Sequence, residues 1–384
     1  MQKLYKIILL FTFVLVLSCT KDEDSCSLTM RHSDVSCNKG SMFITVKASG
    51  NWNLDIDFGG AESWASLNHS SGQGNDYSVV LSYDANPTEE TRTLALILTS
   101  GKAKEYRNFS QLPKAAAPNY LELPAFVSED GYGFYTHRMD FPRKNFRNYS
   151  FYYSFDDYVA LWVAYPLNVA LHSSHTREDA FQDDPYLLPS QQAVLGSRGF
   201  RDSNGKAGVY DRGHQLPSAD RWCTKEANVQ TFYGTNMTPQ IGNFNQKIWA
   251  DLEMKVRGYS ANATSDTLYV VTGCVVEGSS KYAIDNAGKH VTVPVAYYKA
   301  LLRYKPGASN TVDGSGYNAI AFYLEHKSYS RQEVAGEDVM SVRELESKLG
   351  IDLFTNLQYK VSQETYDKIE SQNPLTVTNV WGRF

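Results

Sequence analysis

Alternating apolar and polar residues mark the first part of the chain, from about residue 26 to residue 113. The segment 52–56 alternates strictly, so its apolar side chains would face one side of a β-strand. Further β-rich runs, separated by clusters of Gly, Asn, Ser and Pro, occupy residues 43–46, 77–83 and 93–99. Short strands with regular turn signals predict a small all-β, Ig-like sandwich over residues 26–113.

A linker of sequence Lys-Ala-Ala-Ala-Pro-Asn at residues 114–119 precedes the second part of the chain, residues 120–384. Strand-like and helix-like patterns are interspersed there, which predicts one α+β domain. A capping box formed by Ser341 and Glu344 opens a helix that Gly350 is expected to end. The predicted strands, the first two of which form a hairpin, are residues 151–153, 159–165, 268–272, 291–304 and 318–324.

The N-terminus predicts export. Two lysines, Lys3 and Lys6, precede a largely apolar run that is too short to span a bilayer, so residues 1–18 are interpreted as a signal peptide. The ending Val-Leu-Ser-Cys resembles a bacterial lipobox, which implies cleavage before Cys19 and acylation of that residue. The alternative is an ordinary signal peptide followed by a chance cysteine.

Residues 19–25 are predicted to be a tether. The acidic stretch at 21–24 resembles the export tag of surface lipoproteins, and a merely solvated tether is the alternative. Together these features predict a bacterial lipoprotein at the outer membrane and cell surface, held by a lipid on Cys19. No other stretch has 18 consecutive apolar residues, so the remainder is expected to be soluble.

Net charge and cysteine usage narrow the chemistry. The formal net charge of −5 argues against tight nucleic-acid binding through bulk charge. Four cysteines follow Cys19, and the favoured pairs among three pairings are Cys26–Cys37 and Cys223–Cys274. The sequence contains no C-x-x-C pair, which argues against a structural zinc site. A catalytic site could still carry local positive charge. The basic residues that cluster in the sequence are Arg138, Arg143, Lys144, Arg147, Arg198, Arg201, Arg212, Arg221 and Lys225. The alternative is that they are scattered over the surface.

The sequence Asp-Arg-Gly-His at residues 211–214 is the strongest chemical feature. Residues 210–214 can end a strand, and Asn236 follows farther along the chain. Histidine is the natural general base near neutral pH. Carboxamide and carboxylate oxygens, with water, suit Mg²⁺. These residue types can therefore activate a water beside a phosphate, whereas Asp211 is interpreted as a turn or supporting residue.

A helix is predicted to begin near the second group of polar residues. Asn243 or Asn245 would cap it, and it would run through Trp249, a predicted core residue, to about Arg257. Asn245 and Glu253 would then lie within one broad stripe of the helix surface. A helix N-terminus at this point also favours an anionic phosphate.

Together, DRGH at 211–214, TNMTPQ at 235–240, FNQKIW at 244–249 and the following LE resemble the DNA/RNA non-specific endonuclease family. The resemblance extends upstream to TREDAF at 176–181 and downstream to segments 269–273 and 293–299, so it covers most of residues 120–384. It implies a ββα-metal finger within the α+β domain. It also implies a metal-dependent endonuclease that uses Mg²⁺, with Mn²⁺ as the alternative ion.

The same resemblance implies a role for each matching position. His214 matches the general base, Asn245 the direct metal ligand, and Glu253 the carboxylate that contacts metal-bound water. Asn236 matches a residue that supports the histidine. Arg177 matches an arginine that stabilises the phosphate. Arg212 matches the motif arginine, whose part in catalysis is less defined.

Each of these residues also has a structural interpretation. His214 alone would be a structural histidine, Asn245 a helix cap, and Asn236 a turn residue. Glu253 would be a surface helix residue. The arginines would be structural ion-pair partners, namely Arg177 and Arg212.

The N-terminal part is similar to the BACON domain. The residues that carry this similarity in order are Gly50-Asn51-Trp52, Trp64-Ala65-Ser66-Leu67, residues 71–75, Ala85-Asn86, Arg92-Thr93 and Gln111. That family is a β-sandwich often described as carbohydrate-binding, which implies a glycan ligand. A spacer that holds the catalytic domain off the membrane is the favoured alternative, because Trp52 and Trp64 both fit a core.

The favoured function is a surface-anchored, sugar-nonspecific endonuclease that contacts DNA and RNA through their phosphates. The first alternative is a surface lipoprotein that binds glycan or nucleic acid and no longer cuts. The second is an antagonistic toxin, which a lipid anchor argues against. No protein partner is evident from the sequence.

Overall fold

The computed structural model describes residues 24–30, 33–35, 40–88, 90–111, 120–125, 131–172, 175–260 and 266–384. The predicted signal peptide, Cys19, Cys37 and the linker at 114–119 lie outside these ranges. The chain divides into two compact units, Met1–Lys114 and Ala115–Phe384. Across the described segments, no helix has the length and apolar character needed to cross a membrane.

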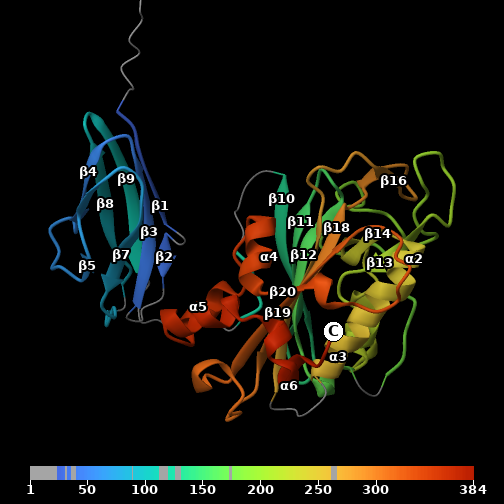
Figure 1. The fold of residues 1–384 in the computed structure, drawn as a ribbon. Coiled ribbons are helices and arrows are strands. Elements are labelled where there is room, and N and C mark those ends of the chain that lie inside the picture. Colours follow the sequence, from blue (N-terminus) through green and yellow to red (C-terminus); the bar gives the residue numbers. More distant parts are fainter. Residues whose placement is uncertain are drawn as a thin grey trace, which may run out of the picture. The chain divides into compact units, whose positions relative to one another are not determined.

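The N-terminal unit is all-β and consists of two sheets around one shared core (Figure 1). The first sheet has the order β1 (Cys26–Met30), β3 (Gly40–Ala48), β7 (Asp76–Tyr83) and β5 (Ala65–Leu67). The second has the order β2 (Asp34–Val35), β9 (Ala103–Gln111), β8 (Arg92–Ser100), β4 (Asn51–Asp57) and β6 (Ser71–Gln73). The strands predicted at 43–46, 52–56, 77–83 and 93–99 are confirmed.

Strand alternation builds this core. Leu94, Leu96 and Leu98 on β8 are buried, while the residues between them are half-buried. Burying a leucine side chain fully contributes roughly 1.5–3 kcal/mol. Trp52 and Trp64 are also buried, as predicted, so neither indole is available to stack on a sugar.

A seven-stranded antiparallel sheet forms the centre of the C-terminal unit, which is mixed α/β as predicted. Strands β11 and β12 form the expected hairpin, with Ser154 opposite Val159. The sheet has the order β10 (Tyr132–Met139), β11 (Phe146–Ser154), β12 (Val159–Leu167), β15 (Thr267–Val275), β18 (Ala296–Tyr304), β19 (Tyr317–Glu325) and β20 (Val339–Met340).

The strand predicted over residues 291–304 is in fact two strands. β17 (His290–Thr292) pairs with β16 (Tyr282–Ile284) in a separate small sheet, and β18 begins at Ala296 in the central sheet. Pro294 lies between them, and proline has no N–H to donate to a ladder. The single-strand prediction was therefore wrong at this proline.

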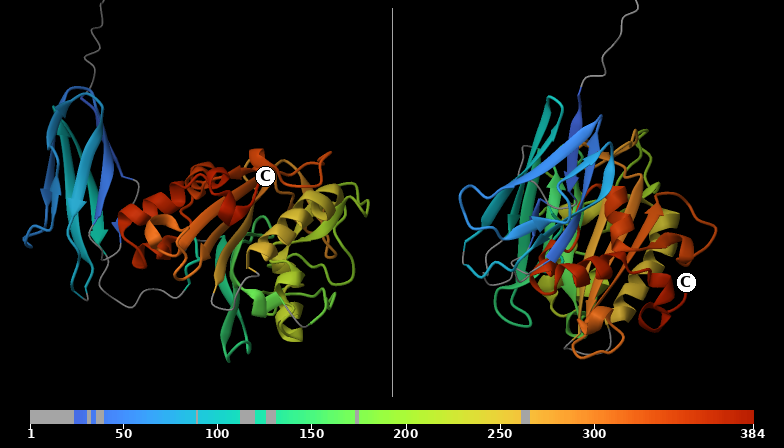
Figure 2. Two further views of the ribbon diagram at one scale, coloured as in Figure 1. Left: turned by 60° about the horizontal axis from the view of Figure 1, so that its bottom comes forward. Right: turned by 60° about the vertical axis from the view of Figure 1, so that its left-hand side comes forward.

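Both faces of the central sheet are buried, and neighbouring residues of one strand belong to different cores. Phe151 packs with one core and Tyr152 with the other, and Tyr297 and Tyr298 divide in the same way. Helix α3 (Ala250–Ser260) covers one face, while α4 (Val342–Leu349) and α5 (Gln363–Ser371) cover the other (Figures 1 and 2). The remaining α-helices are α1 (Lys225–Gln230), α2 (Gly242–Phe244) and α6 (Thr378–Trp381).

Helix α4 begins and ends as its sequence predicts. The Ser341 side chain accepts a hydrogen bond from Glu344 N, and the Glu344 carboxylate accepts one from Ser341 N. Gly350 ends the helix in the left-handed conformation, with φ of 69°. Replacing an N-cap serine with alanine typically costs about 1 kcal/mol.

Candidate active site

The Asp-Arg-Gly-His segment lies on a short hairpin. It forms β13 (Tyr210–His214), which pairs antiparallel with β14 (Met237–Ile241) so that His214 is opposite Met237. A Cβ atom at Gly213 would lie 2.3 Å from the Gln240 side chain, which explains the glycine. The chain passes directly from β14 into a helix, so two strands and a helix form one β-β-α unit beside the central sheet (Figure 1).

The helix after β14 begins earlier than the sequence predicts. Its N-cap residue is Ile241, so the prediction that Asn243 or Asn245 caps it was wrong. The strand runs straight into α2, and a π-helical turn over Asn245–Trp249 connects α2 to α3. Single π-turns are frequent at functional sites. Trp249 is fully buried, as predicted.

Asp211 orients the side chain of Asn245. Its Oδ2 atom accepts hydrogen bonds from Asn245 Nδ2 at 3.0 Å and from Gln246 Nε2 at 2.8 Å. An ionised carboxylate only accepts hydrogen bonds, so the amide nitrogen of Asn245 must face Asp211. The Oδ1 atom of Asn245 therefore points away from Asp211 and forms no hydrogen bond to the described residues. Sequence reasoning placed Asp211 only as a turn or supporting residue.

His214 lies in an apolar pocket with one unpartnered nitrogen. Its side chain is edge-on to Phe232, with 5.0 Å between ring centroids, and to Phe181, with 6.1 Å. Nε2 is buried and has no hydrogen-bond partner among the residues of the described ranges. Burial, aided by the charges of Arg177 and Arg212, lowers the pKa of His214 to about 3. The ring is therefore neutral and able to accept a proton at physiological pH.

The two arginines predicted for the site flank the same aromatic pair. The Arg177 guanidinium lies 4.8 Å from the Phe232 ring, and that of Arg212 lies 3.3 Å from the Phe181 ring. Arg177 is exposed and pairs with Asp179 at 2.7 Å. Sequence analysis gave no role to the two phenylalanines, although Phe181 ends the quoted TREDAF motif.

Asn236 is fully buried and holds the loop that follows the histidine. Its Nδ2 donates to Leu216 O at 2.9 Å and to Thr231 O at 2.7 Å. Its Oδ1 accepts from Leu216 N at 2.8 Å, and its backbone oxygen accepts from Gln215 N at 3.0 Å. Both amide protons are used within the protein, so Asn236 fixes the backbone directly after His214 and has no proton left to donate to a substrate.

Glu253 is partly exposed and lies near buried charges beneath the helix. Burial raises the pKa of Glu253, while the charge of Lys299 acts in the opposite direction. Lys299 is fully buried, with its ammonium 3.1 Å from Thr272 Oγ1 and 4.5 Å from the Trp249 ring. The sequence gave no direct signal for this lysine beyond its place in the quoted downstream segment.

Some predicted basic groups face inward instead of toward a substrate. Arg147 is buried against Glu122, and Arg221 is buried with its guanidinium on Pro166 O and Asn148 O. Arg212 donates from Nη1 to Leu195 O at 3.0 Å. A guanidinium taken out of water needs such partners, and the carboxylate and carbonyl oxygens supply them here.

The predicted disulfide between Cys223 and Cys274 is wrong, because both residues are buried free thiols. Cys274 Sγ donates to Ala160 O at 3.4 Å within the central sheet. Burial raises the pKa of both thiols, so they remain protonated and unreactive. Cys26 is also a free thiol, and its predicted partner lies outside the described residues.

The residues at the hairpin and helix fit a hard divalent cation. Asn245 Oδ1 is an available oxygen donor, Glu253 adds a carboxylate about two turns farther along the same helical segment, and His214 Nε2 is an unpartnered buried acceptor. Mg²⁺ accepts few protein oxygens and keeps several waters. This donor set therefore suits a loosely held Mg²⁺ and not a structural zinc.

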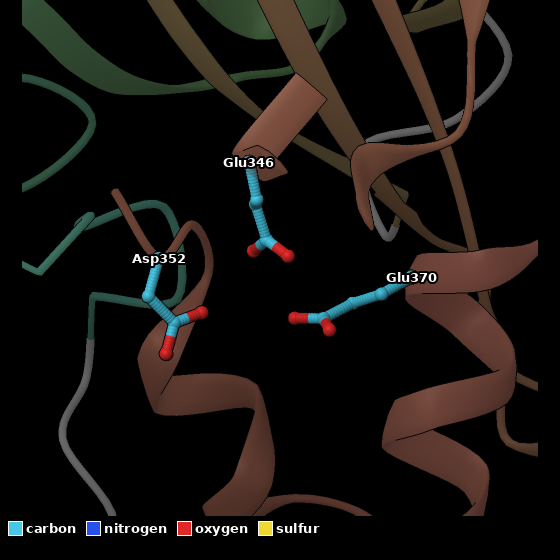
Figure 3. Close-up of side chains that lie close together, drawn as sticks. All are labelled: Glu346, Asp352 and Glu370. Carbon is cyan, nitrogen blue, oxygen red and sulfur yellow. The ribbon is translucent and has the colours of Figure 1, made fainter. Parts of the chain in front are cut away.

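A second carboxylate group lies on the opposite face of the sheet (Figure 3). Glu346 on α4, Glu370 on α5 and Asp352 have oxygens within 4.8 Å of one another. Glu346 accepts a hydrogen bond from Leu353 N at 2.8 Å, and Glu370 pairs with Arg343 at 3.4 Å. The Arg343–Glu370 pair joins α4 to α5, the Leu353 contact holds the segment after α4, and the cluster is separate from the histidine site.

Comparison with known proteins identifies the relatives of this arrangement. The sequence profile described as DNA/RNA non-specific endonuclease matches residues 133–360. A nuclease from Nostoc sp. is 31% identical over 224 residues, which are 58% of this chain and 77% of that protein. Nuclease 1 of Schizosaccharomyces pombe mitochondria is 28% identical over 47% of this chain and 55% of its own length, so the chain spans about half of that relative. A solved EndoG/EndoGI complex has a TM-score of 0.42 and 21% identity, covering 54% of this chain and 83% of the solved chain.

Proposed function

Because the chain belongs to the DNA/RNA non-specific endonuclease family, we propose that it is an Mg²⁺-dependent, sugar-nonspecific endonuclease that hydrolyses phosphodiester bonds in DNA and RNA. One observation supports this most strongly. A neutral, buried His214 with an unpartnered Nε2 lies on the hairpin whose Asp211 orients Asn245. An unpartnered base, His214 Nε2, and an unpartnered amide oxygen, Asn245 Oδ1, thus occur in one β-β-α unit. We infer that this unit is the metal finger.

In this proposal His214 is the general base. Its neutral Nε2 takes the proton of the attacking water, and the loop held by Asn236 keeps the ring in place. Asn245 Oδ1 would hold Mg²⁺, with Mn²⁺ as the alternative ion, and Glu253 would orient the waters around it. The bound cation supplies charge neutralisation on the phosphate and on the leaving oxygen.

The exposed Arg177 guanidinium is free to turn from Asp179 to a substrate phosphate. Phosphate contacts carry little sequence information, which suits a nuclease that accepts both DNA and RNA. Arg212 supports the pocket through Phe181 and adds positive charge near His214. Activity should fall steeply as salt rises, because phosphate contacts release counterions.

The N-terminal features suggest where this activity operates. We propose that the protein is an exported lipoprotein at the cell surface, anchored through Cys19, with the all-β unit acting as a BACON-like spacer. A glycan-binding role for that unit has less support, since both Trp52 and Trp64 are buried. Cys19→Ala should release the protein from membranes, and membrane association that persists in this variant would exclude the lipid anchor.

The decisive experiment compares the mature protein with His214→Ala on plasmid DNA and on RNA, each with Mg²⁺ or with EDTA. Cleavage of both substrates that needs Mg²⁺ and is abolished by the substitution supports the proposal. A folded wild-type protein that cuts neither substrate would favour the alternative of a surface protein that binds glycan or nucleic acid without cutting.

A further inference from the structure

The helix that carries Asn245 is held at its N-cap residue, Ile241, by His326, which directly follows strand β19. The Nε2 atom of His326 accepts a hydrogen bond from Ile241 N at 2.8 Å, and its Nδ1 donates to Pro294 O at 2.8 Å. A backbone N–H only donates and a carbonyl only accepts, so both partners require the neutral Nδ1–H tautomer. The ring also packs edge-on against Phe244, with 5.3 Å between centroids.

The helix has no side-chain cap at its start, so contacts from outside the hairpin hold this end. Ile241 is both the last residue of β14 and the N-cap of α2, and an isoleucine side chain cannot accept a hydrogen bond from the helix. The segment after β19 provides outside contacts. Besides the bond from Ile241 N to His326, Tyr329 N donates to Asn243 Oδ1 at 3.0 Å. Farther along, Val334 N donates to Asp251 Oδ2 at 3.1 Å.

The two ends of the arrangement fix Asn245 from opposite sides. Asp211 on β13 holds the amide group, while His326 holds the backbone where the helix starts. A metal ligand on the first turn of a helix moves with that turn. Residues that hold a ligand without touching the metal typically change metal affinity by about 10- to 100-fold when they are replaced.

We propose that His326 is a positioning residue for the metal site, fixing the strand-to-helix junction so that Asn245 Oδ1 is preorganised to bind the cation. The inference rests on the proposed role of Asn245. It assigns His326 a function that is distinct from catalysis, because the ring contacts neither the substrate side of His214 nor Asn245 itself.

The test uses the full mature chain and three variants. His326→Phe keeps an aromatic ring against Phe244 but removes both hydrogen bonds. His326→Gln retains one acceptor and one donor. Lys327→Ala, at an exposed neighbouring position, is the matched control. Binding of Mn²⁺ alone to the substrate-free proteins is measured by electron paramagnetic resonance, alongside the Mg²⁺ concentration that gives half-maximal cleavage and the melting temperature.

We expect His326→Phe to weaken Mn²⁺ binding by about tenfold and to raise the half-maximal Mg²⁺ concentration by a similar factor. Cleavage at saturating Mg²⁺ should stay close to that of wild type, because the substitution changes no group that contacts the substrate, and His326→Gln should recover most of the affinity. Unchanged Mn²⁺ binding in a folded His326→Phe variant would overturn the inference. A fall in maximal rate and melting temperature without a change in Mn²⁺ affinity would also overturn it, because it would show a purely structural role.

The same measurements separate this inference from the proposed function. Suppose that wild type binds Mn²⁺, that Asn245→Ala weakens this binding, and that wild type still does not cleave nucleic acid. In that case the nuclease proposal fails. The role of His326 is still decided by the Mn²⁺ measurements in that case. If wild type cleaves with Mg²⁺ and all His326 variants match it in Mn²⁺ affinity, only the inference fails.

Discussion

Asp211 Oδ2 accepts a hydrogen bond from Asn245 Nδ2 at 3.0 Å, which joins the Asp-Arg-Gly-His strand to the helix that follows the hairpin. The contact sets which atom of the Asn245 amide faces away from the strand. A carboxylate only accepts hydrogen bonds, so the atom of Asn245 that faces Asp211 must be the amide nitrogen. An aspartate that contacts no reacting group therefore controls the ligand that the metal would use.

Asp211→Asn should weaken Mg²⁺ binding by about 10- to 100-fold. An amide at position 211 can donate, so Asn245 is free to turn its oxygen inward and away from the cation. The measurement is the Mg²⁺ dependence of plasmid cleavage, with the melting temperature as a check on folding. Gln246→Ala, which removes the other partner of Asp211, serves as the control and should have a much smaller effect.

Protonation of His214 should not lower the rate as the pH passes through 6.5. Burial and two arginines lower the pKa of His214 to about 3, so the ring keeps its proton-accepting form at any pH above that value. In Glu253→Gln, the acid limb of kcat/KM, measured at saturating Mg²⁺ from about pH 4 to about pH 9, should therefore lie well below 6.5. The variant is needed because burial raises the pKa of Glu253 to about 7, so its protonation in wild type falls in the same range. An acid limb near 6.5 that persists in Glu253→Gln would contradict the buried, neutral state of His214.

Replacing the two arginines should have different effects. Arg177 is exposed with one ion-pair partner, so Arg177→Ala should lower kcat/KM by about 10²-fold through loss of a phosphate contact. Arg212 also packs on Phe181 and donates to Leu195 O, so Arg212→Ala should lower the melting temperature as well. Steady-state kinetics and thermal melts on both variants test this. Equal melting temperatures for Arg212→Ala and Arg177→Ala would refute the structural role of Arg212.

Glu346→Gln should stabilise the protein increasingly as the pH rises above 4.5. Burial and the neighbouring Glu370 and Asp352 raise the pKa of Glu346, so the folded state holds a proton that the unfolded state releases. Stability from this proton is complete below the unfolded pKa and is lost as the pH rises toward the raised folded value. Melting temperatures of wild type and variant across pH measure the effect. Glu364→Gln, on the exposed side of α5, should show no such trend.

A fragment from Asn119 to Phe384 should fold and keep its nuclease activity. The hydrophobic cores of the C-terminal unit contain only residues from Leu121 onward, and the all-β unit has a core of its own. The fragment is compared with the mature chain in melting temperature and in kcat/KM on plasmid DNA. A folded but inactive fragment would mean that the N-terminal unit contributes to the site.

Local sequence patterns predicted most of the strands and the start and end of α4, because alternation, a capping box and a C-terminal glycine act within a few residues. The motif also pointed to His214, Asn236 and Asn245, whose roles stay predictions. The helix start at Ile241 was missed, since it depends on contacts with residues far along the chain. Phe181, Phe232 and the buried Lys299 were missed for the same reason. Their importance comes from tertiary neighbours that no short pattern reports.

The division of the central sheet into two cores has a practical consequence for protein engineering. Adjacent residues such as Phe151 and Tyr152 report to opposite sides, so a substitution at one position disturbs one layer more than the other. The layer of α4 and α5 could therefore be redesigned, labelled or fused to a sensor while the histidine hairpin is left intact. The sheet would act as a rigid partition between a working face and an adaptable one.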